Sequence, residues 1–232
     1  MTLSPSQDDR TKRLVTVVQE LSLARDLDRI MTIVRRAARE LTGADGATFV
    51  LRDGSCCHYV DEDAIEPLWK GQRFPLDACI SGWSMLNRQP AIIENIYADP
   101  RVPADAYRPT FVKSLVMVPI RTAEPVGAIG NYWADRHTAT EHEVALLAAL
   151  ADSTSIAMEN VQLYETLEHR VRERTSELAA SRAELEAKHE ALLRLQRQKD
   201  EMAALLAHDL RSPASGIMLS CKAQLRKPQL TA

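Results

Sequence analysis

The chain has 232 residues, of which 45% are hydrophobic and 26% are charged, a composition that fits a folded protein rather than a disordered one. The net charge of −3 argues against a broad basic surface for nucleic acid. The N-terminus lacks the apolar core of a signal peptide, and no apolar run approaches the roughly 18 residues of a membrane span. We therefore expect a cytoplasmic chain without a nucleic-acid or membrane partner.

The N-terminal segment predicts helices. Residues 1–9 are polar and are expected to be flexible. From about Arg10 to Ala38, apolar residues recur at the spacing of one helix face. Asp26 or Asp28 is suitable as the N-cap of a second helix. Two helices, or one bent helix, should therefore precede the first strand.

The middle of the chain alternates short apolar runs with turn signals. An Asp53-Gly54 turn joins the first two runs, as in a β-hairpin. The expected strands are residues 47–51, 56–60, 91–94, 114–120 and 126–133, with a short helix and loop in 61–73, a short helix ending near Asn87 and a long loop over 95–110. This order predicts an α+β domain with an antiparallel sheet.

A long helix should follow the last strand. Thr140 and Glu143 have the spacing of a capping box, and neither Gly nor Pro occurs between Gly130 and Pro213. We expect one helix from Thr140 to past Leu210, bent near Pro213 because proline lacks the N–H of the helical hydrogen bond. About 70 helical residues would extend roughly 100 Å, more than a domain of this size can bury.

An apolar residue recurs at every seventh position of this helix, at Val171, Leu178, Leu185 and Leu192. Leu195 and Met202, again seven residues apart, follow this series. The second seam position holds polar residues: Arg174, Ser181 and Lys188. We expect a parallel two-stranded coiled coil, and hence a homodimer. Docking of the helix on its own domain is the alternative.

Residues 10–162 resemble a GAF domain. The resemblance rests on Ser81-Gly82-Trp83 before a short helix, the strand end Ile93-Glu94-Asn95, the run from Lys113 to Ile120, and Val126-Gly127-Ala128-Ile129-Gly130. It implies a GAF-like sheet with flanking helices and an unidentified small-molecule ligand. The candidate pocket residues are Trp83, Tyr97, Tyr107, Met117 and Asn131, although such residues are more often part of a core.

The stretch from Asp200 to Pro213, with its His-Asp-Leu-Arg-Ser-Pro core, resembles the phosphoacceptor box of two-component sensor histidine kinases. By this resemblance, His208 is the phosphorylated residue and Asp209 the assisting acid or base. Val171 to Leu178 resembles the signalling-helix connector of such kinases. The implied domains are a GAF sensor (10–162), a coiled coil (163–199) and the first helix of the phosphoacceptor domain (200–232).

The chain departs from the histidine kinase pattern in two ways. Ala214 replaces the leucine that usually follows the proline. No segment offers the family's ATP-binding motifs or a G-x-x-x-x-G-K-[ST] loop, so this chain alone should neither bind ATP nor transfer phosphate. ATP and magnesium would act only through a separate catalytic ATPase domain, and a response regulator is the implied downstream partner. The sequence leaves open whether the chain is a fragment or a natural truncation.

The cysteines Cys56, Cys57, Cys79 and Cys221 form no C-x-x-C pair and are interpreted as buried or bystander thiols. Cys56 and His58 share a strand face, but two ligands are too few for a structural zinc site, so no metal is expected. Bilin attachment in GAF domains typically uses a Cys-His pair where this chain has residues 106–109, which disfavours a bilin chromophore.

Two alternative functions stay open. The chain could be a non-catalytic GAF adaptor that only dimerises, with a vestigial His208. It could also be a thiol redox enzyme, because some GAF domains reduce free methionine sulfoxide and Cys79 directly precedes the Ile80-Ser81-Gly82 segment.

Overall fold

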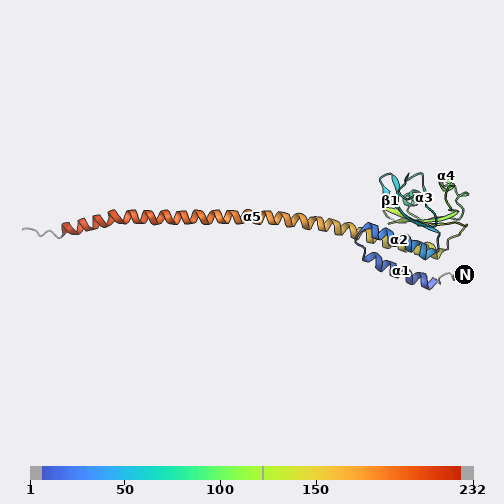
Figure 1. The fold of residues 1–232 in the computed structure, drawn as a ribbon, viewed down its shortest axis with the longest axis horizontal. Coiled ribbons are helices and arrows are strands. Elements are labelled where there is room, and N and C mark those ends of the chain that lie inside the picture. The colour runs from blue at the N-terminus through green and yellow to red at the C-terminus, as the bar shows by residue number, and fades with distance from the viewer. Residues whose placement is uncertain (1–6, 122, 226–232) are drawn as a thin grey trace, which may run out of the picture. The chain divides into compact units, whose positions relative to one another are not determined.

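The computed structural model describes residues 7–121 and 123–225. Its strands form one six-stranded antiparallel sheet in the order β3-β2-β1-β6-β5-β4. Figure 1 shows the fold, with α2 running beside the sheet. The helices are α1 (Gln7–Ser22), α2 (Leu27–Thr42), α3 (Ile80–Asn87), α4 (Ala104–Tyr107) and α5 (Glu141–Leu225). The strands are β1 (Gly46–Asp53), β2 (Cys56–Ala64), β3 (Arg73–Pro75), β4 (Ala91–Ile93), β5 (Ser114–Ile120) and β6 (Gly127–Trp133). The predicted α+β fold with an antiparallel sheet is confirmed.

The first two helices are separate, and local signals fix the ends of α2. The carboxylate of Asp26 accepts a hydrogen bond from the Arg29 N–H at 2.7 Å, so Asp26 is the N-cap. Gly43 ends the helix in the left-handed conformation, with φ of 71°. The apolar face of α2 then packs on the sheet.

The short helix predicted in 61–73 is wrong, whereas the predicted loop is right for residues 65–72. Strand β2 continues to Ala64, and Arg73 begins the short strand β3. The acidic residues at the end of β2 masked its strand pattern in the sequence. They are tolerated there because they have partners: Asp61 forms ion pairs with Arg35 at 2.9 Å and Lys70 at 2.8 Å. Strand β3 has only three residues, too few to show an alternating pattern.

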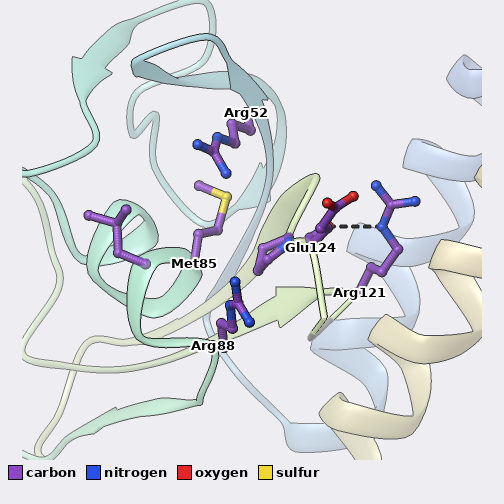
Figure 2. Close-up of a pocket in the computed structure, with 7 residues that line it drawn as sticks. Arg52, Met85, Arg88, Arg121 and Glu124 are labelled. Atoms are coloured by element: carbon purple, nitrogen blue, oxygen red, sulfur yellow. Dashed lines mark hydrogen bonds between the residues drawn. The ribbon is translucent and has the colours of Figure 1, made fainter.

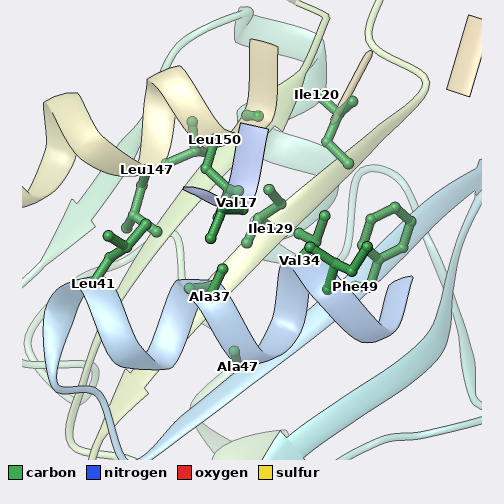
Figure 3. Packing of buried hydrophobic residues seen from close by; sticks show 14 of the residues in the cluster. Val17, Val34, Ala37, Leu41, Ala47, Phe49, Ile120, Ile129, Leu147 and Leu150 are labelled. Atoms are coloured by element: carbon green, nitrogen blue, oxygen red, sulfur yellow. The ribbon is translucent and has the colours of Figure 1, made fainter. Parts of the chain in front are cut away.

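One face of the sheet is covered by α2 and the first turns of α5, and α1 packs against these helices (Figure 1 and Figure 3). Apolar side chains from all three helices interdigitate there with side chains from β1, β5 and β6. The central members are Val17, Val34, Ala37, Leu41, Phe49, Ile120, Ile129, Leu147 and Leu150. This face anchors α5 to the domain.

The opposite face carries a second apolar cluster beneath α3, α4 and their loops. All residues of β5 and β6 are buried, because both faces of these strands are covered. Along β5, Leu115 and Met117 belong to this second cluster, whereas Val116 and Val118 belong to the cluster under the long helices. The two apolar clusters therefore lie on opposite faces of the same sheet, and alternate residues of β5 contribute to each of them.

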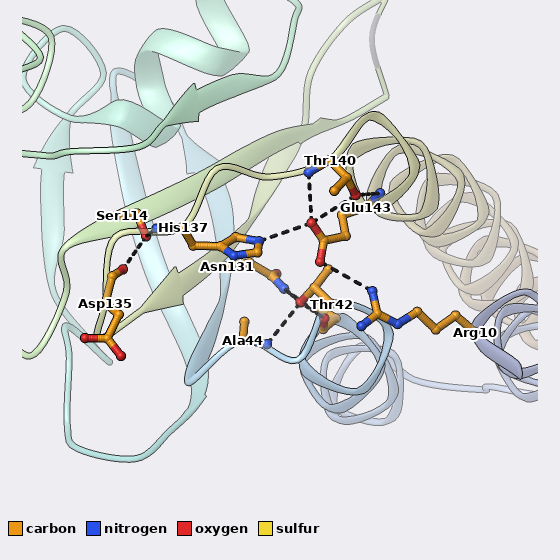
Figure 4. A network of polar contacts seen from close by, with 10 residues as sticks. Arg10, Thr42, Ala44, Ser114, Asn131, Asp135, His137, Thr140 and Glu143 are labelled. Carbon is orange, nitrogen blue, oxygen red and sulfur yellow. Dashed lines mark hydrogen bonds and ion pairs between the residues drawn. The ribbon is translucent and has the colours of Figure 1, made fainter. Parts of the chain in front are cut away.

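A polar network fixes the beginning of α5 (Figure 4). The buried carboxylate of Glu143 accepts hydrogen bonds from the Thr140 N–H at 2.9 Å and from the Thr140 hydroxyl at 3.1 Å. The Glu143 N–H donates to the Thr140 hydroxyl at 3.2 Å, which completes the predicted capping box. His137 contacts the same carboxylate at 3.1 Å, and Arg10 of α1 pairs with it at 3.3 Å.

Beyond the domain core, α5 changes character. Every residue from Gln162 to Asp209 is exposed. The helix continues through Pro213 to Leu225, so the proline does not end it, and the side chains of residues 210–217 lie outside the described ones. The chain divides into two compact units, Met1–Thr166 and Leu167–Ala232. The finer predicted boundaries, 163–199 and 200–232, remain predictions.

The described part of α5, Glu141–Asp209, is long and apolar enough to cross a membrane by length and composition alone. Of its most apolar window, 44% is buried within the protein. The first turns of α5 belong to the core described above, and core helices pass the same test. The finding is weak evidence for a span.

Candidate functional site

A small cavity of about 100 Å³ lies on the sheet face opposite α1 and α2. Aromatic rings make most of its wall, and two ring pairs hold them edge to face: Trp69 with Tyr59 at 5.6 Å and Trp69 with Tyr107 at 4.8 Å between centroids. The lining residues are Tyr59, Trp69, Phe74, Ala78, Cys79, Pro103, Ala106 and Tyr107. We call this space the aromatic cavity.

The one thiol that lines the aromatic cavity is Cys79, the N-cap residue of α3. Its sulfur accepts a hydrogen bond from the Gly82 N–H at 3.4 Å and lies 3.2 Å from the Ser81 hydroxyl. A hydrogen bond with Cys57, opposed by burial and supported by Ser81 and Gly82, lowers the pKa of Cys79 to about 6. The thiol of Cys57 has a raised pKa because of the same hydrogen bond and its burial.

The hydroxyl of Ser81 is held in turn by Tyr59, with 2.9 Å between the two oxygens. Burial raises the pKa of Tyr59 and of Tyr107 well above the usual range, so both phenols stay neutral. The cavity therefore has neutral aromatic walls, and among its lining residues the thiol of Cys79 is the group that ionises near neutral pH.

The structure brings only one predicted pocket residue, Tyr107, to this cavity. Met117 is buried in the apolar cluster on the same sheet face. Asn131 lies on the opposite side, where its amide donates to the Ala38 carbonyl at 2.8 Å and the Thr42 hydroxyl at 2.7 Å. The remaining two make cation–π contacts. The Arg101 guanidinium lies 4.6 Å from the centre of the Trp83 ring, and the Lys113 ammonium lies 5.2 Å from the centre of the Tyr97 ring.

Sequence reasoning missed most of the aromatic wall. Trp69 falls in the segment predicted as helix and loop, Phe74 directly follows that segment, and Tyr59 falls in a strand whose inward face was not assigned. Cys79 was noticed beside the Ser81-Gly82 motif, but its contact with Cys57 depends on strand pairing. The available signal was the density of aromatic residues between positions 59 and 74.

A second, more open depression of about 460 Å³ lies at the end of the sheet (Figure 2). It is lined by three arginines: Arg52 near the end of β1, Arg88 just after α3, and Arg121 just after β5. The Arg121 guanidinium donates to the Glu124 carbonyl at 2.8 Å and pairs with Glu159 of α5 at 3.1 Å. This arginine-lined depression was not predicted.

The predicted phosphoacceptor lies on an exposed part of α5. The side chain of His208 is 82% exposed, and its Nδ1 atom is 3.4 Å from the Asp209 carboxylate. Leu205 and Leu206, on the preceding turn, are also exposed. The described residues include no group of three or more His, Cys, Asp or Glu side chains placed to hold a metal ion.

The GAF domain family profile matches residues 24–159, which is more than half of the chain. The chain therefore belongs to the GAF domain family, whose members sense small molecules, and the resemblance identified from the sequence is confirmed. A comparison with curated proteins finds no match.

Several solved structures share the fold. A free methionine-R-sulfoxide reductase from Neisseria meningitidis, in complex with its substrate, has 14% identity and a TM-score of 0.61, covering 71% of this chain and 96% of that one. The GAF domain of a phosphoenolpyruvate-protein phosphotransferase from Coxiella burnetii has 17% identity and a TM-score of 0.61, covering 70% and 99%. The GAF-B domain of DevS from Mycobacterium smegmatis has 18% identity and a TM-score of 0.50, covering 62% and 99%. These identities show a common fold alone.

Proposed function

We propose that this chain is the sensory and dimerising part of a two-component histidine kinase, in which a small-molecule or redox signal at the aromatic cavity acts through α5 on His208. One observation carries the proposal: α5 begins in the core of the GAF domain and then stays exposed from Gln162 to a His208-Asp209 pair. A helix that buries nothing over this length is marginal alone and needs a partner.

The partner is a second copy of this chain. Val171, Leu178, Leu185 and Leu192 are each at least 63% exposed although they are apolar. Their seven-residue spacing is the spacing that a parallel coiled coil buries. A two-fold dimer would place the same stripe on both chains and cover it.

The His208-Asp209 pair has the groups that phosphoacceptor chemistry requires. A neutral imidazole nitrogen attacks the γ-phosphorus of ATP, and the bond from that phosphorus to the bridging oxygen of ADP breaks. The Asp209 carboxylate, 3.4 Å from Nδ1, orients the ring and accepts its proton. The ATP and magnesium would be held by a separate catalytic ATPase domain, and the phosphoryl group would pass to a response regulator. We place this relay in the cytoplasm.

The test is phosphorylation in trans. The chain is mixed with ATP, magnesium and a purified catalytic domain from a histidine kinase with the same His-Asp-Leu-Arg-Ser-Pro box. We expect an acid-labile, alkali-stable label on His208, no label when the catalytic domain is omitted, and loss of the label in His208→Gln.

The matched controls are His169→Gln and His189→Gln, two exposed histidines on the same helix. Both should keep the label. Label that persists in His208→Gln, or its absence from the unmodified chain while the donor's own acceptor domain is labelled, would reject the proposal. The second result would favour a dimerising GAF adaptor.

A thiol redox enzyme is the second candidate. It is favoured by the contact between Cys57 and Cys79 and by the fold shared with a methionine sulfoxide reductase. Turnover of free methionine sulfoxide with a dithiol reductant, lost in Cys79→Ser, would support it. The cavity of about 100 Å³ is small for that substrate, since ligand pockets usually measure about 300–1,000 Å³.

A further inference from the structure

Cys57 and Cys79 belong to different elements of the fold but come close together beside the aromatic cavity. Cys57 lies on β2 and pairs with Phe74 of β3. The chain then turns through Pro75, whose carbonyl lies 3.4 Å from the Cys79 sulfur. This path returns the N-cap of α3 to β2. The Ser81 hydroxyl lies 3.2 Å from the Cys79 sulfur and 2.9 Å from the hydroxyl of Tyr59, which shares a strand face with Cys57. The two thiols belong to the same buried cluster, and each shifts the pKa of the other.

The two thiols differ in access. Cys79 lines the aromatic cavity, whereas Cys57 is fully buried and is not part of the cavity wall. A molecule in the cavity therefore reaches the sulfur of Cys79 first. Cys57 is placed behind it, as a resolving thiol is placed behind an attacking one.

Hydrogen bonds to the Cys79 sulfur favour its thiolate form. The Gly82 N–H and the Ser81 hydroxyl both lie within 3.4 Å of it. Its lowered pKa, about 6, means that most of this thiol is ionised at neutral pH. The thiolate is the nucleophilic form of cysteine, and an ionised, accessible thiol beside a second thiol is the usual arrangement of a redox-sensing cysteine.

The size of the cavity limits the reactant. A volume of about 100 Å³ corresponds to a few water molecules at about 30 Å³ each. Hydrogen peroxide and short alkyl hydroperoxides fit such a space, and a drug-sized ligand does not. Apart from the Cys79 thiolate, the residues that line the cavity carry no charge that could bind an ionic ligand.

We propose that Cys79 and Cys57 form a thiol switch that small hydroperoxides close to a disulfide. The Cys79 thiolate attacks the distal peroxide oxygen, the O–O bond breaks, and the leaving alkoxide or hydroxide takes a proton to give an alcohol or water. The Cys57 sulfur then attacks the Cys79 sulfenic acid, forming the S–S bond and releasing water. The two thiols lose two electrons in total, and the peroxide gains them.

Closing this disulfide would change how α3 is held. The Gly82 N–H would lose its thiolate acceptor, and the start of α3 would be tied to β2. Further along α3, the Ser84 hydroxyl donates a hydrogen bond to the Met117 carbonyl at 3.3 Å, so α3 also contacts β5. The role of this switch as the signal that the sensor domain transmits rests on the proposed function. Formation of the disulfide does not depend on that function.

The experiment uses the full chain with Cys56→Ser, which removes the thiol adjacent to Cys57. The protein is treated with hydrogen peroxide at pH 7, free thiols are alkylated, and tryptic peptides are mapped without reduction. Cleavage after Arg52, Lys70, Arg73 and Arg88 places Cys57 in peptide 53–70 and Cys79 in peptide 74–88. We expect these two peptides to be linked, and the link to disappear on reduction.

Two further variants assign the roles. Cys57→Ala should leave a sulfenic acid on Cys79 that a dimedone-type reagent traps, without the linked peptides. Cys79→Ser should abolish both products and keep the start of α3, because serine is a preferred N-cap residue. In the Cys56→Ser protein, the oxidation rate should rise with pH to half its maximum near pH 6, as the pKa of Cys79 implies.

Peptides 53–70 and 74–88 that stay unlinked and reduced in the folded protein would overturn the switch, and so would a disulfide that involves Cys221 instead. A disulfide that forms as expected, in a protein whose His208 fails the phosphorylation test, would uphold the switch and reject the kinase proposal. The two proposals therefore fail independently.

Discussion

At the scale of single residues, Glu143 connects three parts of the domain. Its buried carboxylate caps α5 through Thr140, contacts His137 and pairs with Arg10 of α1. Burial opposes ionisation, but the hydrogen bonds from Thr140 and His137 outweigh it and lower the pKa of Glu143. The ionised form is therefore more favoured in the folded state than in the unfolded one.

The sign of the pH effect follows. The pKa of Glu143 is lower in the folded state than in the unfolded state, where it is about 4.3. Its contribution to the free energy of unfolding is therefore complete above the unfolded-state pKa and is lost as the pH falls through the folded-state pKa. Glu143→Gln should lower the free energy of unfolding at pH 7 by about 1–3 kcal/mol. Urea unfolding at pH 7 and pH 3.5 (roughly one unit below the ordinary Glu pKa) measures both effects.

The matched control is Glu141→Gln, an exposed glutamate in the same first turn. Its stability difference from the unmodified protein should be small at both pH values. A Glu143→Gln protein that loses as much stability between the two pH values as the unmodified protein would show that this carboxylate does not carry the effect.

At the scale of elements, the start of α3 depends on one glycine. A Cβ atom at Gly82 would overlap the carbonyl oxygen of Leu76, a backbone atom that cannot rotate away. This close approach lets the loop from Leu76 to Cys79 fold over the first turn of α3. Both the N-cap thiol and the adjacent cavity wall are placed by that packing.

Gly82→Ala should therefore destabilise the domain by more than about 2 kcal/mol, as a backbone clash in a core usually does. Denaturant unfolding followed by tryptophan fluorescence would measure it, since all three tryptophans lie in this domain. Gly54→Asn is the control, since Gly54 has φ of 59° and open space, and asparagine tolerates the left-handed region. Equal stability of the two variants would contradict the steric explanation.

Most elements of the domain could be predicted from local sequence, because strong strands and capped helices carry their own signals. The run from Ser114 to Ile120 and the Thr140–Glu143 capping box are examples. The aromatic cavity could not be predicted in the same way. Its wall comes from strands and loops whose register is set by tertiary pairing, as between Cys57 and Phe74, and only Tyr107 was selected in advance.

At the scale of the whole molecule, the exposed stripe on α5 sets the expected assembly. Leu185→Asp places a charge in the middle of the stripe and should weaken a dimer without changing the GAF domain, which lies in a different compact unit. Analytical ultracentrifugation at tens of micromolar (roughly where weak coiled coils associate) should show a dimer for the unmodified chain and monomer for Leu185→Asp. Thermal unfolding of the GAF core should be unchanged.

The control is Glu186→Asp, a residue beside the stripe that is also exposed but is expected to face away from the seam. It should sediment as the unmodified chain does. A monomer for the unmodified chain would contradict the homodimer and favour docking of the helix elsewhere.

The alternation of β5 and β6 between the two apolar clusters makes the domain suitable for engineering. Leu115, Met117 and Tyr132 point to the cavity layer, while Val116 and Ile129 support the helices. Substitutions confined to the first set would change the apolar layer on the cavity side of the sheet and leave the packing of α5 intact. Libraries built on this domain can therefore vary the cavity side of the sheet and the side that anchors α5 as separate modules, provided that the strand register is kept.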